Sequence, residues 1–207
     1  MNLKKLKEAE ANFFAFYPKG FEDEALLPII KRHNTEGIGK SVRELFAQEK
    51  FRNPDEICES FAKIVSKSSL ISLFEKPKVR DMIKQMRMDQ RDMLSIALYE
   101  LLHGKQEKGF EMIVEVLAIY TLAKWSIVTL IPYYYDREKN FFIKPTTTKD
   151  IIKFFEIDGL TYKPRPTYEF YDRYTQVLGE MKSHVSPMIG EDNAGFTGFL
   201  MMAMKRE

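Results

Sequence analysis

Residues 112–131 have the sequence Met-Ile-Val-Glu-Val-Leu-Ala-Ile-Tyr-Thr-Leu-Ala-Lys-Trp-Ser-Ile-Val-Thr-Leu-Ile, and this stretch decides the fold. It is almost wholly apolar and long enough to cross a bilayer. Glu115 and Lys124, however, project from opposite sides of a helix, and each would cost roughly 2.5–3.5 kcal/mol at the middle of a membrane. We therefore predict a central helix, from Phe110 to Ile131, that its own domain buries all round.

Aromatic side chains dominate the segment that follows this stretch. An aromatic run at 133–135 is separated by the polar residues 136–140 from a second aromatic run at 141–143. Two such runs around a polar turn predict a β-hairpin. Helix signals prevail in the rest of the chain. The predicted fold class is therefore mainly α, a compact helical domain with one aromatic β-hairpin.

The clearest helix start is Asn53-Pro54, because Asn is a favoured N-cap and Pro suits the first helical position. The expected helices, besides the central one, span residues 3–17 and 22–33, open at Ser41, Pro54 and Pro77, and span 93–103, 146–156, 167–185 and 192–204. Because 207 residues match the length of one domain, we expect a single domain over residues 1–207. The alternative is a sub-division near residue 132 into a helical part (1–132) and a part with the hairpin and further helices (133–207).

The composition excludes several classes of protein. Hydrophobic residues make up 44% and the net charge is only +2, which argues against a disordered tail or a broadly basic, histone-like chain. Cys58 is the only cysteine, so no intramolecular disulfide can form. The first twenty residues lack the apolar core of a signal peptide. We expect a cytoplasmic protein with no membrane partner.

Three short motifs resemble catalytic signatures without completing them. Residues 34–41 come close to a phosphate-binding P-loop, but Asn34 stands where the first glycine is needed. Residues 60–63 match S-x-x-K and residues 100–103 match E-x-x-H, each without the further elements that its chemistry requires. Cys58 would be a nucleophile only if the fold brought a histidine to it. We predict no metal and no cofactor, and favour a protein that is not an enzyme.

Five cations follow one side of the expected fifth helix. They are Lys76, Arg80, Lys84, Arg87 and Arg91. At 100° per residue they lie within about 80° of one another. Like charges at this spacing destabilise a helix slightly, so a partner charge would offset them. That charge could come from a nucleic acid, an acidic protein, solvent ions or acidic side chains of the same chain. Our leading hypothesis is a non-catalytic binding or accessory module for a polyanion, either nucleic acid or an acidic partner.

A second group of residues suits an anion at a helix start. It comprises Lys144, Thr146, Thr147, Thr148 and Lys149. Free amides and the helix dipole favour negative charge there. This group supports the alternative of an enzyme acting on a small phosphorylated or acidic ligand, bound between the hairpin and the helix that starts at Thr146. A third alternative is a structural homo-oligomer joined through the Met-rich helix Asp192–Met204.

The second half of the chain resembles a module of uncharacterised bacterial proteins. The resemblance rests on Ala123-Lys124-Trp125, on the segment from Phe141 to Lys149 and on Tyr168-Glu169-Phe170-Tyr171, and it covers about the last 85 residues. In that module a Trp-containing apolar helix precedes an aromatic hairpin, a Lys-Pro turn and a helix start. The resemblance implies a bacterial protein in a nucleic-acid setting, among restriction or mobile-element genes, and it assigns no catalytic residue.

Overall fold

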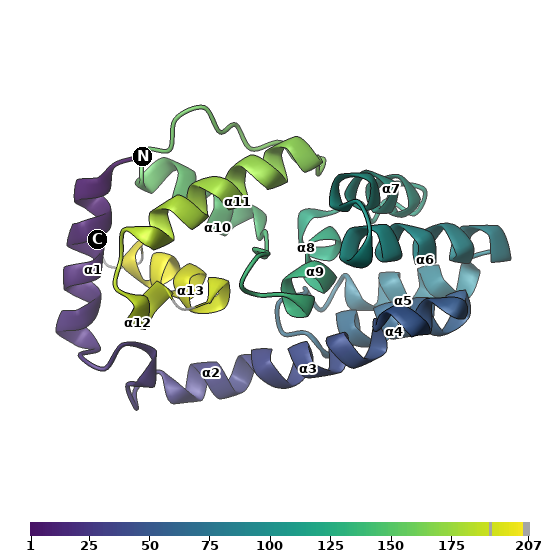
Figure 1. Ribbon diagram of the computed structural model, residues 1–207, viewed down its shortest axis with the longest axis horizontal. Helices are drawn as coiled ribbons and strands as arrows, with labels where there is room; N and C mark the ends of the chain where they lie inside the picture. Colours follow the sequence, from purple (N-terminus) through teal and green to yellow (C-terminus); the bar gives the residue numbers. More distant parts are fainter. Residues whose placement is uncertain (191, 205–207) are drawn as a thin grey trace.

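The computed structural model describes residues 1–190 and 192–204, and this part of the chain consists of helices and loops (Figure 1). The elements are α1 (Leu3–Phe16), η1 (Gly20–Glu22), α2 (Leu27–His33), α3 (Thr35–Leu45), η2 (Gln48–Arg52), α4 (Pro54–Lys67), α5 (Lys76–Gln85), α6 (Met88–His103), α7 (Gln106–Ala118), α8 (Trp125–Val128), α9 (Leu130–Tyr135), α10 (Pro145–Phe154), α11 (Tyr168–Ser183), α12 (Pro187–Gly190) and α13 (Asn193–Met204). The prediction of a mainly α fold is confirmed.

The helices form two packed groups, with α2 along one edge between them (Figure 1). Helices α3 to α9 pack on one another, and α1 packs with α13, which also contacts α10 and α12. The N-terminal helix thus lies with the C-terminal helices. The amide of Asn2 donates to the carbonyl of Phe155 over 2.7 Å and fixes the start of α1 there.

The predicted β-hairpin is wrong, because no strand occurs among the described residues. The tyrosine run is the end of helix α9, where the amide of Tyr133 donates to the carbonyl of Thr129. The second aromatic run is extended but unpaired with the first, and its Ile143 amide donates to the Thr129 hydroxyl over 3.0 Å. Aromatic residues favour strands because a sheet surface buries them, and here the helical core buries them instead.

The predicted central helix is also interrupted. Helix α7 ends at Ala118, where Thr121 has a left-handed φ of 56°. The amides of Thr121 and Leu122 donate back to the carbonyls of Ala118 and Leu117, which is the hydrogen-bond pattern of a Schellman cap. The chain then re-enters the core at Trp125 as the short helices α8 and α9. Among the described residues, no helix has both the length and the apolar character that a membrane span requires.

Capping explains why several expected helices form. The side chain of Asn53 accepts from the amide of Glu56, which confirms the predicted start of α4. The predicted start at Ser41 is wrong, because α3 already begins at Thr35 and the Ser41 hydroxyl donates to the Gly37 carbonyl within it. The residues that resemble a P-loop are therefore mostly helical, and from Ile38 onward their amides are used within the helix.

Candidate polyanion-binding surface

The five predicted stripe cations do not lie on one helix. Helix α5 ends at Gln85, and the extended backbone of Met86 and Arg87 separates it from α6. Lys76, Arg80 and Lys84 belong to α5, whereas Arg87 and Arg91 lie at the start of α6. The prediction that all five cations share one side requires one continuous helix. Only Lys76, Arg80 and Lys84, which lie on α5, meet that condition.

Arg91 is occupied within the fold. Its guanidinium donates to the Asp55 carboxylate over 2.9 Å and to the Ile83 carbonyl over 2.6 Å, and it lies 3.7 Å from Glu59. Only 18% of its side chain is exposed. Arg91 therefore ties α6 to α4 and to the end of α5, which is the intramolecular pairing that the sequence left open.

Arg80 and Arg87 have acidic neighbours on their own segments but remain exposed. Arg87 donates twice to Asp89, and this contact holds the pKa of the Asp89 carboxyl below its usual range. Arg80 lies 3.4 Å from Asp81. Exposed ion pairs of this kind contribute little energy and exchange easily. Both guanidinium groups are therefore accessible to an external anion.

Further lysines extend the cationic surface from α5 onto α4, which packs against it. We define the α4–α5 cationic surface by Lys63, Lys67, Lys76, Arg80 and Lys84. Lys78 lies about 200° from Lys76 around α5 and is on the other flank of that helix. Among the described residues, none of the four lysines of this surface has an acidic side chain within ion-pair distance. Residues 63–84 contain six Lys/Arg and only two Asp/Glu, Glu75 and Asp81, a local charge of +4. The sequence analysis missed Lys63 and Lys67, although their i,i+4 spacing places them on one face of a helix.

The second predicted anion site is split by the fold. Helix α10 begins at Pro145, one residue before the expected start at Thr146. Thr147 and Thr148 are buried, and the Thr148 hydroxyl bonds to Tyr174. Lys149 places its ammonium group 5.8 Å from the centre of the Tyr162 ring. Lys144 and Thr146 are exposed. Two of the three hydroxyls thus serve the core, and the hairpin that should have completed the pocket is absent.

The segment predicted to join two copies of the chain packs inside this one. Phe196, Phe199 and Leu200 of α13 are fully buried against neighbouring helices. Asn193, at its start, accepts from the Lys182 ammonium and donates to the Asn140 carbonyl. Met201, Met202 and Met204 of the same helix are only half-buried. Packing within the chain therefore accounts for part of the apolar character of α13, and the homo-oligomer stays a prediction.

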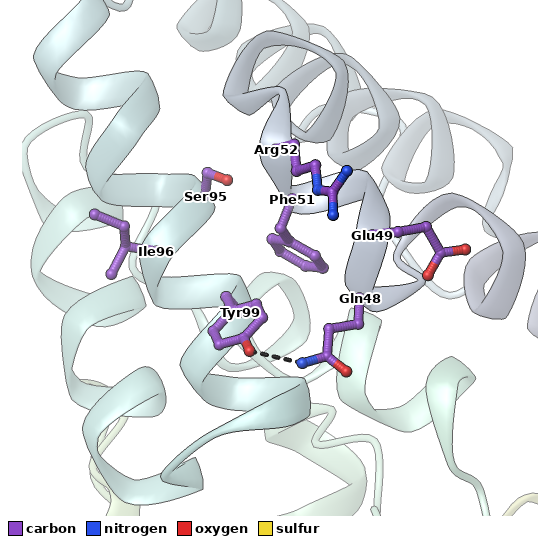
Figure 2. A pocket seen from close by; sticks show the side chains of 7 residues that line it. All are labelled: Gln48, Glu49, Phe51, Arg52, Ser95, Ile96 and Tyr99. Carbon is purple, nitrogen blue, oxygen red and sulfur yellow. Dashed lines mark hydrogen bonds between the residues drawn. The ribbon is translucent and has the colours of Figure 1, made fainter.

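An open cavity of about 550 Å³ lies between η2 and α6 (Figure 2). Gln48 donates its amide to the Tyr99 hydroxyl over 2.9 Å, Phe51 lies between the two elements, and Glu49 and Arg52 stand at the side of η2 (Figure 2). His103 contacts the rings of Phe51 and Tyr99, and it forms a 2.8 Å hydrogen bond with the carbonyl of Phe46. This arrangement packs η2 onto α6 and offers polar groups for binding.

The reactive side chains that the sequence raised are engaged elsewhere. Burial raises the pKa of the Cys58 thiol to about 12, and its sulfur lies 3.6 Å from the Arg91 carbonyl. Glu100 accepts from Lys108 and from the amide of Lys105, whereas His103 turns to the backbone of Phe46. The two E-x-x-H side chains therefore diverge. The described residues contain no group of three or more His, Cys, Asp or Glu side chains that could hold a metal ion.

A second cavity, of about 670 Å³, has the opposite charge. Helices α7 and α11 line it with four carboxylates and one guanidinium. These charged residues are Glu107, Glu169, Asp172, Glu180 and Arg173. This cavity disfavours a polyanion, so the charge of the molecule is segregated between α11 and the α4–α5 cationic surface.

No protein-family model matches the chain, and neither the curated proteins nor the solved structures contain a detectable relative. The interpretation of the cationic surface therefore rests on its geometry.

Proposed function

We propose that the protein is a non-catalytic binding module whose ligand is a polyanion held by the α4–α5 cationic surface. The observation that supports this function is a set of lysines, exposed except for the half-buried Lys76, that no acidic side chain pairs among the described residues. Such a cluster is unfavourable by itself, because the like charges repel one another. A polyanion would offset that repulsion and release its own counterions on binding.

The side chains elsewhere favour binding over catalysis. The Cys58 thiol is buried and protonated at neutral pH, because its pKa is about 12. The cavity beside η2 is lined by the charged side chains of Glu49 and Arg52, and the Gln48 amide there donates to the Tyr99 hydroxyl. These groups suit the binding of a polar ligand. The lysines of α4 and α5 that no acidic side chain pairs among the described residues are point charges on flexible stems, which fit a phosphate or sulfate group.

The test is the binding of three labelled polyanions, short DNA, short RNA and a heparin fragment, by fluorescence anisotropy across a salt series. We expect the logarithm of the affinity to fall linearly with the logarithm of the salt concentration, by about 0.9 per duplex phosphate contact. The triple variant Lys76→Glu, Arg80→Glu and Lys84→Glu should lower that slope by about 2–3 and retain the helical circular dichroism spectrum.

The matched control places the same three charge reversals on exposed lysines of other segments. These are Lys19→Glu, Lys105→Glu and Lys153→Glu. The control changes the net charge equally, so it should weaken binding much less if the ligand contacts α5. Equal losses in the two variants would show a general charge effect and overturn the assignment. The absence of binding to all three probes at about 50 mM salt would overturn the recognition of a soluble polyanion.

A further inference from the structure

The connection between α4 and α5 presents two large apolar side chains to solvent. Leu73 is 78% exposed and Phe74 is 83% exposed. Lys67 precedes this connection at the end of α4, and Lys76 and Lys78 follow it at the start of α5. The α4–α5 cationic surface therefore carries an apolar tip, which we define as Leu73 and Phe74. Exposed apolar side chains adjoining cations are typical of an interaction surface.

The rest of the connection is anchored, so the fold holds this tip outward. The Ser68 hydroxyl is buried and forms a 2.9 Å hydrogen bond with the Tyr134 hydroxyl. Ile71 is buried in the core. At the other end, the Glu75 carboxylate accepts from the Lys124 ammonium over 2.8 Å. Because both ends and the middle are fixed, Leu73 and Phe74 are displayed at a defined position.

Helix α2 brings a second exposed apolar segment to the same region. The His33 ring nitrogen Nδ1 lies 2.8 Å from the Ser69 hydroxyl, at the start of the α4–α5 connection. Ile29 and Ile30 are exposed and lie one turn before His33, so they share its side of the helix. Helix α2 buries none of its own residues. Its isoleucines extend the apolar surface beside the tip.

We propose that the polyanion recognised by the α4–α5 cationic surface is the anionic face of a lipid bilayer, with Leu73 and Phe74 inserted among the acyl chains. This inference rests on the proposed function and names its ligand. The lysines around the tip would contact the anionic headgroups, because an anionic membrane surface attracts cations that lie close to it. Apolar insertion and cationic attraction together give the two signals that stable attachment to a membrane requires.

The chemistry of the apolar side chains favours lipid over nucleic acid. Unpaired bases stack on aromatic faces, whereas only Phe74 among the four apolar residues near the connection is aromatic. Leucine and isoleucine side chains gain little from a base, but acyl chains accept them as readily as phenylalanine. The sequence-based expectation of no membrane partner considered a spanning helix, and this contact is peripheral.

The acidic groups of the region leave this contact net cationic. Glu75 is paired with Lys124, and Asp81 lies beside Arg80. Glu22 and Glu24 precede α2 and lie away from His33, at the opposite end of that helix. They limit the contact to the C-terminal end of α2 and the α4–α5 connection.

The test is co-sedimentation with vesicles of phosphatidylcholine alone and of phosphatidylcholine mixed with phosphatidylglycerol. We expect binding to the mixed vesicles only. The double variant Leu73→Ser and Phe74→Ser should lower the vesicle affinity at least about tenfold, because it removes the inserted apolar surface. The control Leu3→Ser and Met188→Ser changes exposed apolar side chains on α1 and α12, and it should bind as the unmodified protein does.

Insertion has a second readout in the variant Phe74→Trp. Trp125 is buried, so a tryptophan at the tip would report its own environment. Its fluorescence should shift to shorter wavelength with mixed vesicles and stay unchanged with phosphatidylcholine alone. An unshifted spectrum at saturating mixed vesicles would overturn the insertion.

The lipid ligand and the proposed function fail in different ways. Binding to DNA, RNA or heparin without binding to mixed vesicles would overturn the lipid ligand and leave polyanion recognition standing. If the tip variant binds mixed vesicles as tightly as the unmodified protein, the insertion of Leu73 and Phe74 is overturned, because the attraction is then purely electrostatic. Failure to bind any polyanion or any vesicle would overturn both. Loss of vesicle binding by the tip variant, with its heparin affinity retained, supports the lipid ligand.

Discussion

Substituting Arg91 should damage the fold, whereas substituting Lys84 should damage binding. Arg91→Ala removes the ion-pair contacts to the exposed Asp55 and Glu59, worth at most about 1 kcal/mol, and a charged hydrogen bond to the Ile83 carbonyl, worth about 1.5–3 kcal/mol. We expect a loss of about 2–3 kcal/mol in the free energy of unfolding. For a chain of this length, that loss lowers the midpoint of thermal unfolding by about 5–10 °C.

Lys84 is the matched comparison, because it is exposed on α5 and has no ion-pair partner among the described residues. Lys84→Ala should change the free energy of unfolding by less than about 0.5 kcal/mol. It should also lower the salt slope of heparin binding by about one phosphate equivalent. The two assays are thermal unfolding by circular dichroism and anisotropy in a salt series. If Arg91→Ala kept the thermal midpoint and lost binding instead, the division between structural and binding cations would be wrong.

Three further predictions follow from the packing. Gly109→Ala should lower the free energy of unfolding in urea by at least about 1–3 kcal/mol, because a Cβ there collides with the backbone of Leu101 where α6 crosses α7. An unchanged urea midpoint would contradict this close approach. Cys58 should react with a thiol reagent at pH 8 about a thousandfold more slowly than a free cysteine, because burial raises the pKa of the Cys58 thiol from 9.0 to about 12. A rate like that of free cysteine would show that the thiol is open to solvent. Burial also raises the pKa of Tyr171 and Tyr174, so above about pH 9–10 the unfolded chain releases protons that the folded chain keeps. The free energy of unfolding should then fall by roughly 1.4 kcal/mol per pH unit for each of these groups. Urea midpoints that stay level from about pH 9 to 11 would refute this.

Local signals in the sequence were sufficient for the helices that carry their own caps. Asn53 and Pro54 define the start of α4, because the Asn53 side chain accepts a hydrogen bond from the Glu56 amide and the fixed φ of Pro54 suits the first helical position. Both effects act within a few residues. Thr167 similarly caps α11, within one residue of the predicted start. These features depend on short-range geometry, and the sequence shows that geometry directly.

The errors arose where apolar character was the only signal. The run 112–131 is apolar because its helices and Leu122 of its loop are packed into the core, although Ile119 is exposed. Hydrophobicity alone does not mark the Schellman cap at Thr121. The aromatic runs at 133–135 and 141–143 likewise share burial without sharing backbone hydrogen bonds. Side-chain type indicated that these segments are inside, and tertiary packing decided their backbone conformation.

The candidate site shows the same division between local and distant information. The α5 cations followed from helical spacing, but the pairing of Arg91 with Asp55 joins residues 36 positions apart, and no periodicity reveals it. The anion site at Thr146 failed for a related reason, because Thr147 and Thr148 are buried and the Thr148 hydroxyl bonds to Tyr174 of α11. A pattern on one helix therefore locates candidate cations, while the neighbouring helices decide which of them remain available.

Overall charge conceals the feature that most affects binding. The net charge of +2 is the balance of a +4 segment at 63–84 and acidic regions such as the cavity on α11. At physiological salt the screening length is about 8 Å, so charges in the two helix groups act largely independently on a ligand. A polyanion at α5 experiences the lysines there and little of the distant carboxylates. Lowering the salt concentration lengthens the screening distance, so the α11 carboxylates also repel the polyanion. At very low ionic strength the binding affinity should therefore rise less steeply with decreasing salt than the contacts on α5 alone would give.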